Sequence, residues 1–293
     1  MTYHETMQHC TDYIHEHLSE PLTPELLAGI CGYSYSHFCH VFKIFYGISP
    51  GEFIRRERLT SAAGEIAGGK KITDAAFDYG FQTLSGFTRA FTRTYGMNPS
   101  NYQKQNGALS PSDQKKEDHN MTFDVYFKDM DAIAIAAYCF SPREGETVDV
   151  KENGAYWLGK DFSAVSSERY AQLADGRDEI GLWYHPDSSG SLSYLFGTII
   201  KDGDEIPAGL TTFTIPAAHY AVFTTKPVNL KDNPQKFAAS IQDCWRFIYE
   251  KWMDESGYQY DPSGLSYEFY SAANGCLDSD NAVMNIFVPV VKK

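Results

Sequence analysis

Aromatic residues in the first third of the chain recur at helical spacing, and the whole pattern occurs twice. A shift of 49 positions superimposes one segment on the other. The matched pairs are Phe38 and Phe87, Phe42 and Phe91, Tyr46 and Tyr95, Gly47 and Gly96, Pro50 and Pro99, and Phe53 and Tyr102. Residues four apart lie on one face of a helix, so each segment is predicted to be an amphipathic helix that ends at its glycine. A capped helix start follows each glycine.

A short helical segment and a tight turn precede each of these helices. The short segments cover residues 23–31 and 72–79, and a glycine follows each of them. Two helices joined by a short turn with glycine are typical of a helix-turn-helix, and the chain is predicted to contain two. A helix over residues 49–67 joins them, and at 1.5 Å per residue it spans roughly 27 Å. Two recognition helices at that separation are suited to successive major grooves, which recur every ~34 Å.

Beyond residue 120 the apolar positions mostly alternate, as they do in strands, with two longer helical stretches. Strands are predicted over 123–128, 132–140, 180–185, 192–200, 211–215, 219–225, 265–271 and 282–291, and helices over 156–174 and 234–254. The order is two strands, a helix and two strands, and it occurs twice at an offset of 86. Two such halves are expected to form one curved antiparallel sheet with a cleft between them.

The predicted fold therefore has two domains. Residues 1–105 form an all-α domain with the double helix-turn-helix, and residues 121–293 form an α+β domain with duplicated β-β-α-β-β halves. Residues 106–120 contain one large apolar side chain, Leu109, and are expected to be a linker because they bury little surface. All four tryptophans follow this linker.

Charge separates the same two parts. Residues 1–105 carry 9 basic and 10 acidic side chains, whereas residues 106–293 carry 16 and 28. The acidic part repels nucleic acid and tolerates cations. The near-neutral part leaves open whether its cations gather on one face or whether its DNA binding is weak and dimer-dependent. The chain has six scattered cysteines without a C-x-x-C pair, no leader pattern and no long apolar run, which favours a cytoplasmic location without a membrane.

The duplicated helical pattern resembles the AraC/XylS family of transcription regulators over about residues 8–104. The resemblance is carried by Ile72, Ala75, Ala76, Tyr79, Gly80, Phe81, Phe87, Thr88, Arg89, Ala90, Phe91, Tyr95, Gly96, Pro99 and Tyr102. The second part is similar to GyrI-like effector-binding domains, notably at residues 180–182, 206–209, 220–223, 267–270 and 286–290. The combination resembles the Rob-like architecture. The resemblance implies a regulator that binds double-stranded DNA and a small-molecule effector, with RNA polymerase and a second copy of the chain open as further partners.

The polar sides of the two recognition helices supply the candidate DNA contacts. They are Ser36, His37, His40 and Lys43 on the first helix, and Thr83, Ser85, Thr88, Arg89 and Arg93 on the second. Arginine pairs bidentately with guanine, and the resemblance also implies that Arg89 reads bases. His40 matches it in the first helix but reads bases less strongly. Phosphate contacts are expected from Arg55, Arg56 and Arg58. A metal site made of Cys31, His37, Cys39 and His40 is the alternative interpretation of these histidines.

Glu268 is the main candidate for ligand binding. It lies among aromatic and apolar residues in a predicted strand, and burying a carboxylate there raises its pKa unless a cation is bound. An amphipathic cation would supply that charge, and aromatic faces would attract it further. The resemblance implies the same role for Glu268. Further candidates are Trp183, Tyr194, Tyr220 and Trp245. The alternatives are a solvent-facing strand glutamate and ordinary core aromatics.

Two other functions remain open at this point. A near-neutral helical domain also suits a protein that binds or sequesters small molecules and has little affinity for DNA. A GyrI-like hydrolase of reactive small molecules would use Glu268 as its pocket carboxylate. The sequence has no nucleophile elbow, P-loop or zinc-ligand run, so no catalytic residue, metal or cofactor is expected and the protein is not expected to be an enzyme.

Overall fold

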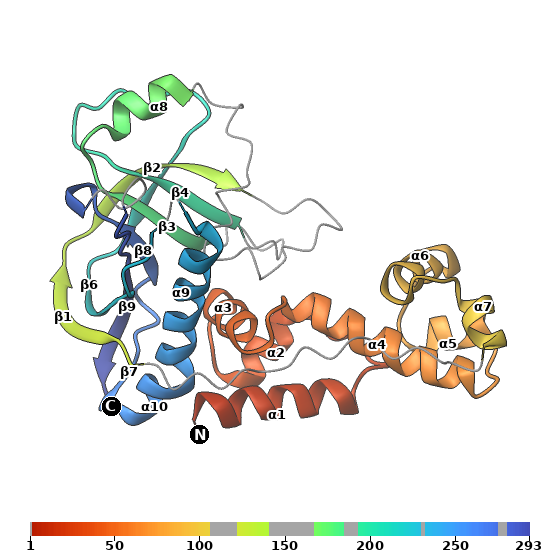
Figure 1. The fold of residues 1–293 in the computed structure, drawn as a ribbon. Coiled ribbons are helices and arrows are strands. Elements are labelled where there is room, and N and C mark those ends of the chain that lie inside the picture. The colour runs from red at the N-terminus through yellow and green to blue at the C-terminus, as the bar shows by residue number, and fades with distance from the viewer. Residues whose placement is uncertain (1, 106–121, 141–166, 185–192, 230–231, 275–279) are drawn as a thin grey trace.

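Figure 1 shows the fold in a computed structural model, which describes residues 2–105, 122–140, 167–184, 193–229, 232–274 and 280–293. Helices are the only regular elements in residues 2–105, and the strands of the sheet lie in the other described stretches. The predicted linker, 106–120, lies outside the described residues, and so does most of the helix predicted over 156–174. The predicted division into a helical domain and a strand-rich domain is confirmed, while the exact boundaries 1–105 and 121–293 stay a prediction.

Seven helices make up the first domain. They are α1 (Tyr3–Glu16), α2 (Pro24–Cys31), α3 (Tyr35–Tyr46), α4 (Pro50–Ala67), α5 (Ile72–Asp78), α6 (Leu84–Tyr95) and α7 (Pro99–Lys104). The pairs α2–α3 and α5–α6 are the two predicted helix-turn-helix units, and α4 joins them as expected. Figure 1 shows α5, α6 and α7 at the far end of α4, away from the sheet; we call these three helices with the end of α4 the distal lobe.

The two recognition helices, α3 and α6, begin and end in the same way. Ser34 Oγ accepts a hydrogen bond from the His37 amide at 3.4 Å, and Thr83 Oγ1 accepts one from the Gly86 amide at 3.1 Å. Each helix ends at a glycine with left-handed backbone, with φ of 77° at Gly47 and 70° at Gly96. A side chain is strained in this conformation, which explains why glycine recurs at the predicted offset.

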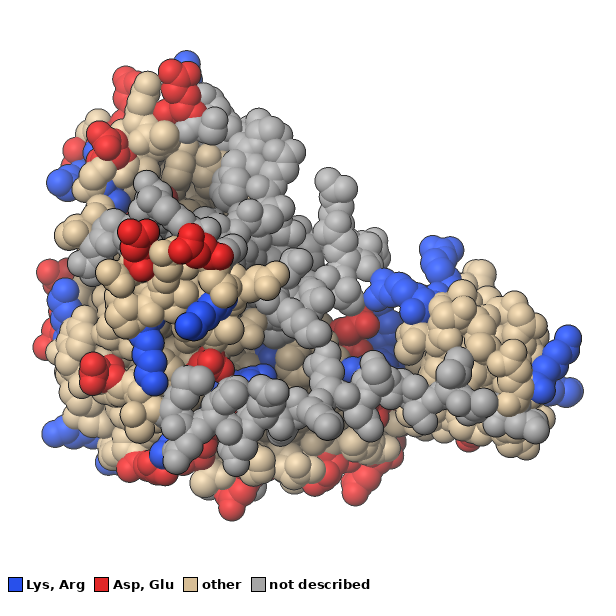
Figure 2. Space-filling model, viewed as in Figure 1, with Lys and Arg blue, Asp and Glu red and all other residues tan. Residues whose placement is uncertain are grey.

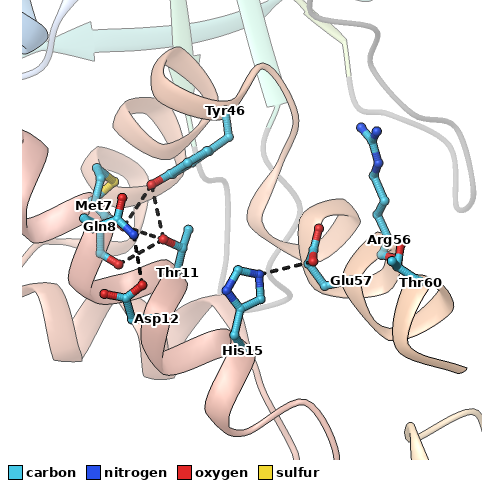
Figure 3. Close-up of polar contacts among 9 residues, drawn as sticks. All are labelled: Met7, Gln8, Thr11, Asp12, His15, Tyr46, Arg56, Glu57 and Thr60. Atoms are coloured by element: carbon cyan, nitrogen blue, oxygen red, sulfur yellow. Dashed lines mark hydrogen bonds and ion pairs between the residues drawn. The ribbon is translucent and has the colours of Figure 1, made fainter. Parts of the chain in front are cut away.

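Helix α1 contacts the first helix-turn-helix and α4 through side-chain hydrogen bonds (Figure 3). The Tyr46 hydroxyl at the end of α3 donates a hydrogen bond to the Met7 carbonyl at 3.0 Å, and His15 Nε2 lies 3.1 Å from Glu57 Oε2 on α4. Arg58 adds a further tie, because its guanidinium donates to the carbonyls of Leu18 at 2.8 Å and Glu20 at 2.6 Å. Arg58 was expected to contact phosphate, but its guanidinium holds α4 to the loop after α1.

The second domain contains nine described strands and two main helices. The strands are β1 (Asp124–Met130), β2 (Ile133–Phe140), β3 (Glu179–Tyr184), β4 (Ser193–Ile199), β5 (Thr211–Ile215), β6 (Ala218–Thr224), β7 (Tyr258–Tyr260), β8 (Tyr267–Tyr270) and β9 (Asn285–Lys292). The helices are α8 (Ser167–Ala174) and α9 (Pro234–Phe247), and α9 continues through a π-helical turn (Ile248–Trp252) into the short α10 (Met253–Glu255). Strand β7 was not predicted.

The strands form one open antiparallel sheet in the order β1-β6-β9-β8-β3-β4-β2-β5, with β7 paired to β9. This order is symmetric about the β3–β8 pair, where the two β-β-α-β-β halves meet. The first strand of each half crosses to the other half, since β1 pairs with β6 and β5 pairs with β2. The duplication and the antiparallel sheet confirm the prediction, and the exchanged first strands join the halves into a single unit.

Both faces of this sheet are buried, and side-chain alternation separates two cores. Tyr220 and Tyr267 belong to the core of one face, whereas Tyr194, Phe223 and Tyr270 belong to the core of the face covered by α9. The α9 core also contains Phe38 and Phe42 of α3, so it continues across the boundary between the domains. The distal lobe has a separate core that includes Phe87, Phe91 and Tyr95.

Candidate effector pocket and DNA-reading helix

Glu268 lies in β8 on the sheet face covered by α9, and its side chain is 4% exposed. Three neutral donors hold its carboxylate. Oε2 accepts hydrogen bonds from the hydroxyls of Tyr194 and Tyr270, both at 2.9 Å, and Oε1 accepts one from Trp245 Nε1 at 3.1 Å. The expectation of a buried carboxylate among aromatic residues therefore fits the structure, and its alternative, a solvent-facing glutamate, does not.

A glycine in the neighbouring strand makes this cluster sterically possible. Gly181 of β3 pairs with Glu268, and the Tyr194 ring lies across it. A Cβ on Gly181 would lie 2.1 Å from the Tyr194 hydroxyl and 3.3 Å from Glu268 Oε2. Any larger residue would push Tyr194 away from the carboxylate. The role of Gly181 and the donor Tyr270 were both missed from sequence, although alternation places Tyr270 on the same face as Glu268.

Electrostatics leave Glu268 short of a partner. Burial raises its pKa, and the hydrogen bonds from Trp245, Tyr270 and Tyr194 counteract this rise in part. In the part of the chain that the structure describes, no cation forms an ion pair with this carboxylate. A buried carboxylate whose only partners are neutral donors gains strongly from a cation placed beside it.

Two cavities open beside Glu268, over the β3–β8 pair where the sheet halves meet. Both are lined by His40, Trp183, Trp245 and Glu268. The first extends towards Ser36, His37 and Tyr260, and the second extends to Lys43 and Arg246. Indole faces beside a carboxylate suit a small aromatic or amphipathic molecule.

Two of the further candidate ligand residues, Trp183 and Trp245, line both cavities. Tyr194 lines neither, but it donates a hydrogen bond to Glu268. Tyr220 does not lie with them: it is 0% exposed on the opposite face of the sheet, with its ring centroid 5.3 Å from that of Tyr267. The structure therefore does not bring Tyr220 together with the other candidates, because its side chain points to the other face of the sheet.

The polar side of α3 is buried against the second domain. His37 is 5% exposed; its Nε2 lies 2.9 Å from the Tyr3 hydroxyl and its ring stacks on Tyr260 at 3.7 Å. His40 presents its ring to Trp245 at 4.5 Å. Burial lowers the pKa of both histidines, that of His40 to about 3, so both are neutral.

Lys43 completes this buried side of α3. It is 6% exposed, and its Nζ lies 4.1 Å from the centroid of the Trp183 ring. Burial lowers the pKa of Lys43 to about 7. Ser36, His37, His40 and Lys43 were expected on an open DNA-facing side. The structure corrects that placement, and their contact with DNA stays a prediction that requires α3 to leave the second domain.

The equivalent side of α6 is open to solvent. Ser85, Thr88, Arg89 and Arg93 line a shallow hollow on the outer face of this helix. Arg89 is exposed, and Arg93 lies 3.7 Å from Glu52 of α4. Thr83 is exposed too, and its hydroxyl caps the helix. Figure 2 shows Lys and Arg side chains over the part of the distal lobe where α6 lies.

The described residues contain neither a candidate metal centre nor a candidate membrane span. Among the residues with described positions, no group of three or more His, Cys, Asp or Glu side chains has the geometry to hold a metal ion. The alternative metal site at Cys31, His37, Cys39 and His40 therefore has no ligand cluster to support it. None of the described helices is both long and apolar enough to span a bilayer.

Two family profiles match the chain. A helix-turn-helix domain matches residues 27–105, and the integron-associated effector binding protein family matches residues 128–290. The second match covers more than half of the chain. The protein therefore belongs to this effector-binding family, and its helical part matches an AraC-type helix-turn-helix domain.

Relatives match the helical part. The regulatory protein SoxS of Salmonella typhimurium is 32% identical over 104 residues, which are 35% of this chain and 97% of SoxS. The probable transcriptional regulator LumQ of Photobacterium leiognathi is 36% identical over 93 residues, which are 31% of this chain and only 38% of LumQ. A solved structure of a probable AraC family regulator from Rhodopseudomonas palustris is 28% identical, with a TM-score of 0.33, and covers 35% of this chain and 97% of that one.

Proposed function

We propose that the protein is a transcription regulator and that its effector is a small amphipathic cation that binds beside Glu268. The observation that carries the proposal is the buried carboxylate with three neutral hydrogen-bond donors and no cationic partner among the described residues. Trp183 and Trp245 supply aromatic faces at the same cavities, which favours a cation with aromatic or apolar groups. Arg246 at the rim of the second cavity is exposed, so solvent screens its repulsion.

The DNA-binding surface that we propose centres on α6. Its outer side is exposed, carries Arg89 and Arg93, and has hydroxyl groups from Thr83, Ser85 and Thr88 for the DNA backbone. Arg89 is the side chain that we assign to base reading, because an arginine fork pairs with guanine O6 and N7. Arg89 and Arg93 give this side of α6 a local positive charge, although the net charge of the whole helical domain is close to zero.

We assign no enzymatic activity to the pocket. Hydrogen bonds from Tyr194, Tyr270 and Trp245 engage both oxygens of Glu268, an arrangement that stabilises a fixed negative charge. We place this function in the cytoplasm, which agrees with the five described cysteines being unpaired thiols.

Tryptophan fluorescence tests the proposed effector class. Titration with tetraphenylphosphonium should give saturable quenching, since Trp183 and Trp245 line the cavities. Glu268→Gln should weaken the apparent affinity by about tenfold or more, because a charge-assisted contact is worth roughly 1.5–3 kcal/mol. Neutral triphenylphosphine oxide should bind wild type and variant alike.

Glu179→Gln is the matched control, because Glu179 is also hydrogen-bonded to a tyrosine, Tyr170 at 2.6 Å, but does not line either cavity. Equal binding of the cation to wild type and Glu268→Gln would contradict the proposal.

A further inference from the structure

Helix α3 performs two roles that exclude each other in space. It is one of the two recognition helices by sequence and by geometry, yet its polar side forms a wall of both cavities at Glu268. Figure 1 shows α3 beside α9, whereas α6 stands clear of the sheet. His37, His40 and Lys43 cannot contact a DNA groove and the second domain at the same time.

Lys43 occupies the position in this interface that is of most chemical interest. It extends from α3 into the second domain, and its ammonium lies on the face of Trp183 at 4.1 Å from the ring centroid. No hydrogen bond or ion pair reaches its Nζ within the described parts of the chain, so the aromatic face is its main partner there. Trp183 and Glu268 both line the cavity that Lys43 enters. The first domain thus places its own cation at the proposed effector site.

We propose that Lys43 is a tethered occupant of the effector site, so that α3 and a cationic effector compete for the Trp183 face. This inference rests on the proposed function, because it requires the effector to be a cation. An effector that takes the indole face displaces Lys43 and, with it, His40 and His37 from the second domain. The first recognition helix is then released and both helices are available to the operator.

The contact is well suited to be displaced. Burial penalises the Lys43 ammonium, as its lowered pKa of about 7 indicates, and no carboxylate forms an ion pair with it among the described residues. A quaternary or phosphonium cation spreads its charge over apolar groups and loses less hydration energy in the same place. The competing states therefore differ by little, and a ligand can shift their populations.

Thermodynamic linkage sets the sign of the effect. If an effector binds only after α3 has left, effector and DNA favour the same released state, and each increases the affinity for the other. The tethered lysine also lowers the apparent affinity for the effector, since part of the binding free energy is used to displace α3.

The experiment compares effector binding by full-length Lys43→Ala with wild type. Alanine removes the whole side chain from the Trp183 face, whether its amine is charged or neutral. Tetraphenylphosphonium should bind the variant about five- to tenfold more tightly, because no part of its binding free energy is then used to displace Lys43. Lys226→Ala is the control, since Lys226 is exposed in the second domain and lines neither cavity. Unchanged or weaker binding by Lys43→Ala overturns the inference.

Amide hydrogen exchange supplies an independent measurement. Saturating tetraphenylphosphonium should increase exchange of residues 35–46 several-fold while residues 84–95 are unaffected. Unchanged or slower exchange in 35–46 would mean that α3 stays as a wall of the occupied site, and would overturn the inference. The proposed function fails in a different way: neither wild type nor Lys43→Ala would then bind the cation, or Glu268→Gln would bind it as wild type does.

Discussion

Helices α3 and α6 have the same length, caps and terminal glycine, yet they lie in different surroundings. The polar side of α6 faces solvent and carries Arg89 and Arg93. The polar side of α3 is covered by α9 and β3, and it carries His37, His40 and Lys43, with His40 at the position equivalent to Arg89. A duplicated motif thus fixes backbone geometry. The side chains on one face of its second helix decide whether that face contacts DNA, the second domain, or each in turn.

Core substitutions at the equivalent positions Phe38 and Phe87 should have the largest effect on stability and should affect different parts of the molecule. Phe38 and Phe87 are both 0% exposed, and replacing either by alanine should lower the free energy of unfolding by about 3–5 kcal/mol. Phe38→Ala should destabilise both domains, since its core includes residues of α9 and the sheet, whereas Phe87→Ala should unfold only the distal lobe. Thermal unfolding with hydrogen exchange distinguishes these results. Loss of sheet protection in Phe87→Ala would contradict the separation of the two cores.

Substitutions on the polar sides of α3 and α6 should have a smaller effect, measured as a change in DNA affinity. In the absence of effector, Arg89→Ala should weaken binding to an operator by about 1–3 kcal/mol, because a base contact is lost. His40→Ala at the equivalent position of α3 should not weaken it, since this imidazole packs on Trp245 and faces away from DNA. Mobility-shift titrations at ~50 mM salt measure both. Arg169→Ala, in α8, is the control, and equal losses in the Arg89 and His40 variants would refute the difference between the helices.

The smallest expected effect is on the pH dependence of α3 docking. The pKa of Lys43 is about 7 when docked, against an ordinary value of 10.5. Between these values the released state binds more protons, so docking strengthens as pH rises from about 7 to 8.5. The change should be a few-fold, less than the roughly tenfold per pH unit for one full proton, because Trp183 stabilises the ammonium.

Other groups around Lys43 do not titrate strongly in this window. Burial keeps His37 and His40 neutral, and it raises the pKa of the Cys39 thiol to about 12. Protection of residues 35–46 relative to 84–95, corrected for intrinsic exchange, reports docking. The trend should vanish in Lys43→Met; if it persists there, another group is responsible.

Much of the fold followed from local patterns. The 49-residue repeat placed both helix-turn-helix units, because caps, glycines and aromatic spacing are properties of neighbouring residues. The alternation in the second half placed eight of the nine described strands for the same reason, and missed the three-residue β7. The pairing partners of the strands could not be predicted from sequence. Strands β1 and β5 each cross to the other half, and such long-range register has no local signal.

Local sequence patterns identified only part of the candidate site. Glu268 stood out because a carboxylate among aromatic residues is unusual, and Trp183, Tyr194 and Trp245 were grouped with it from composition alone. The structure separates Tyr220 from them, because a sequence shows that side chains alternate but not which face a neighbouring strand presents to the same core. Gly181 and Tyr270 became apparent only when β3 and β8 lay side by side.

Two recognition helices, a duplicated sheet and an isolated carboxylate could therefore be predicted from sequence, since each depends on residues near one another in the chain. The docked position of α3 and the exposed position of α6 became apparent only in the folded protein. That difference arises because α9 and β3, more than 130 residues away from α3, bring Trp245 and Trp183 against His40 and Lys43. A polar helix face can be hydrated or can pack against distant indole rings, and its own residues do not distinguish the two.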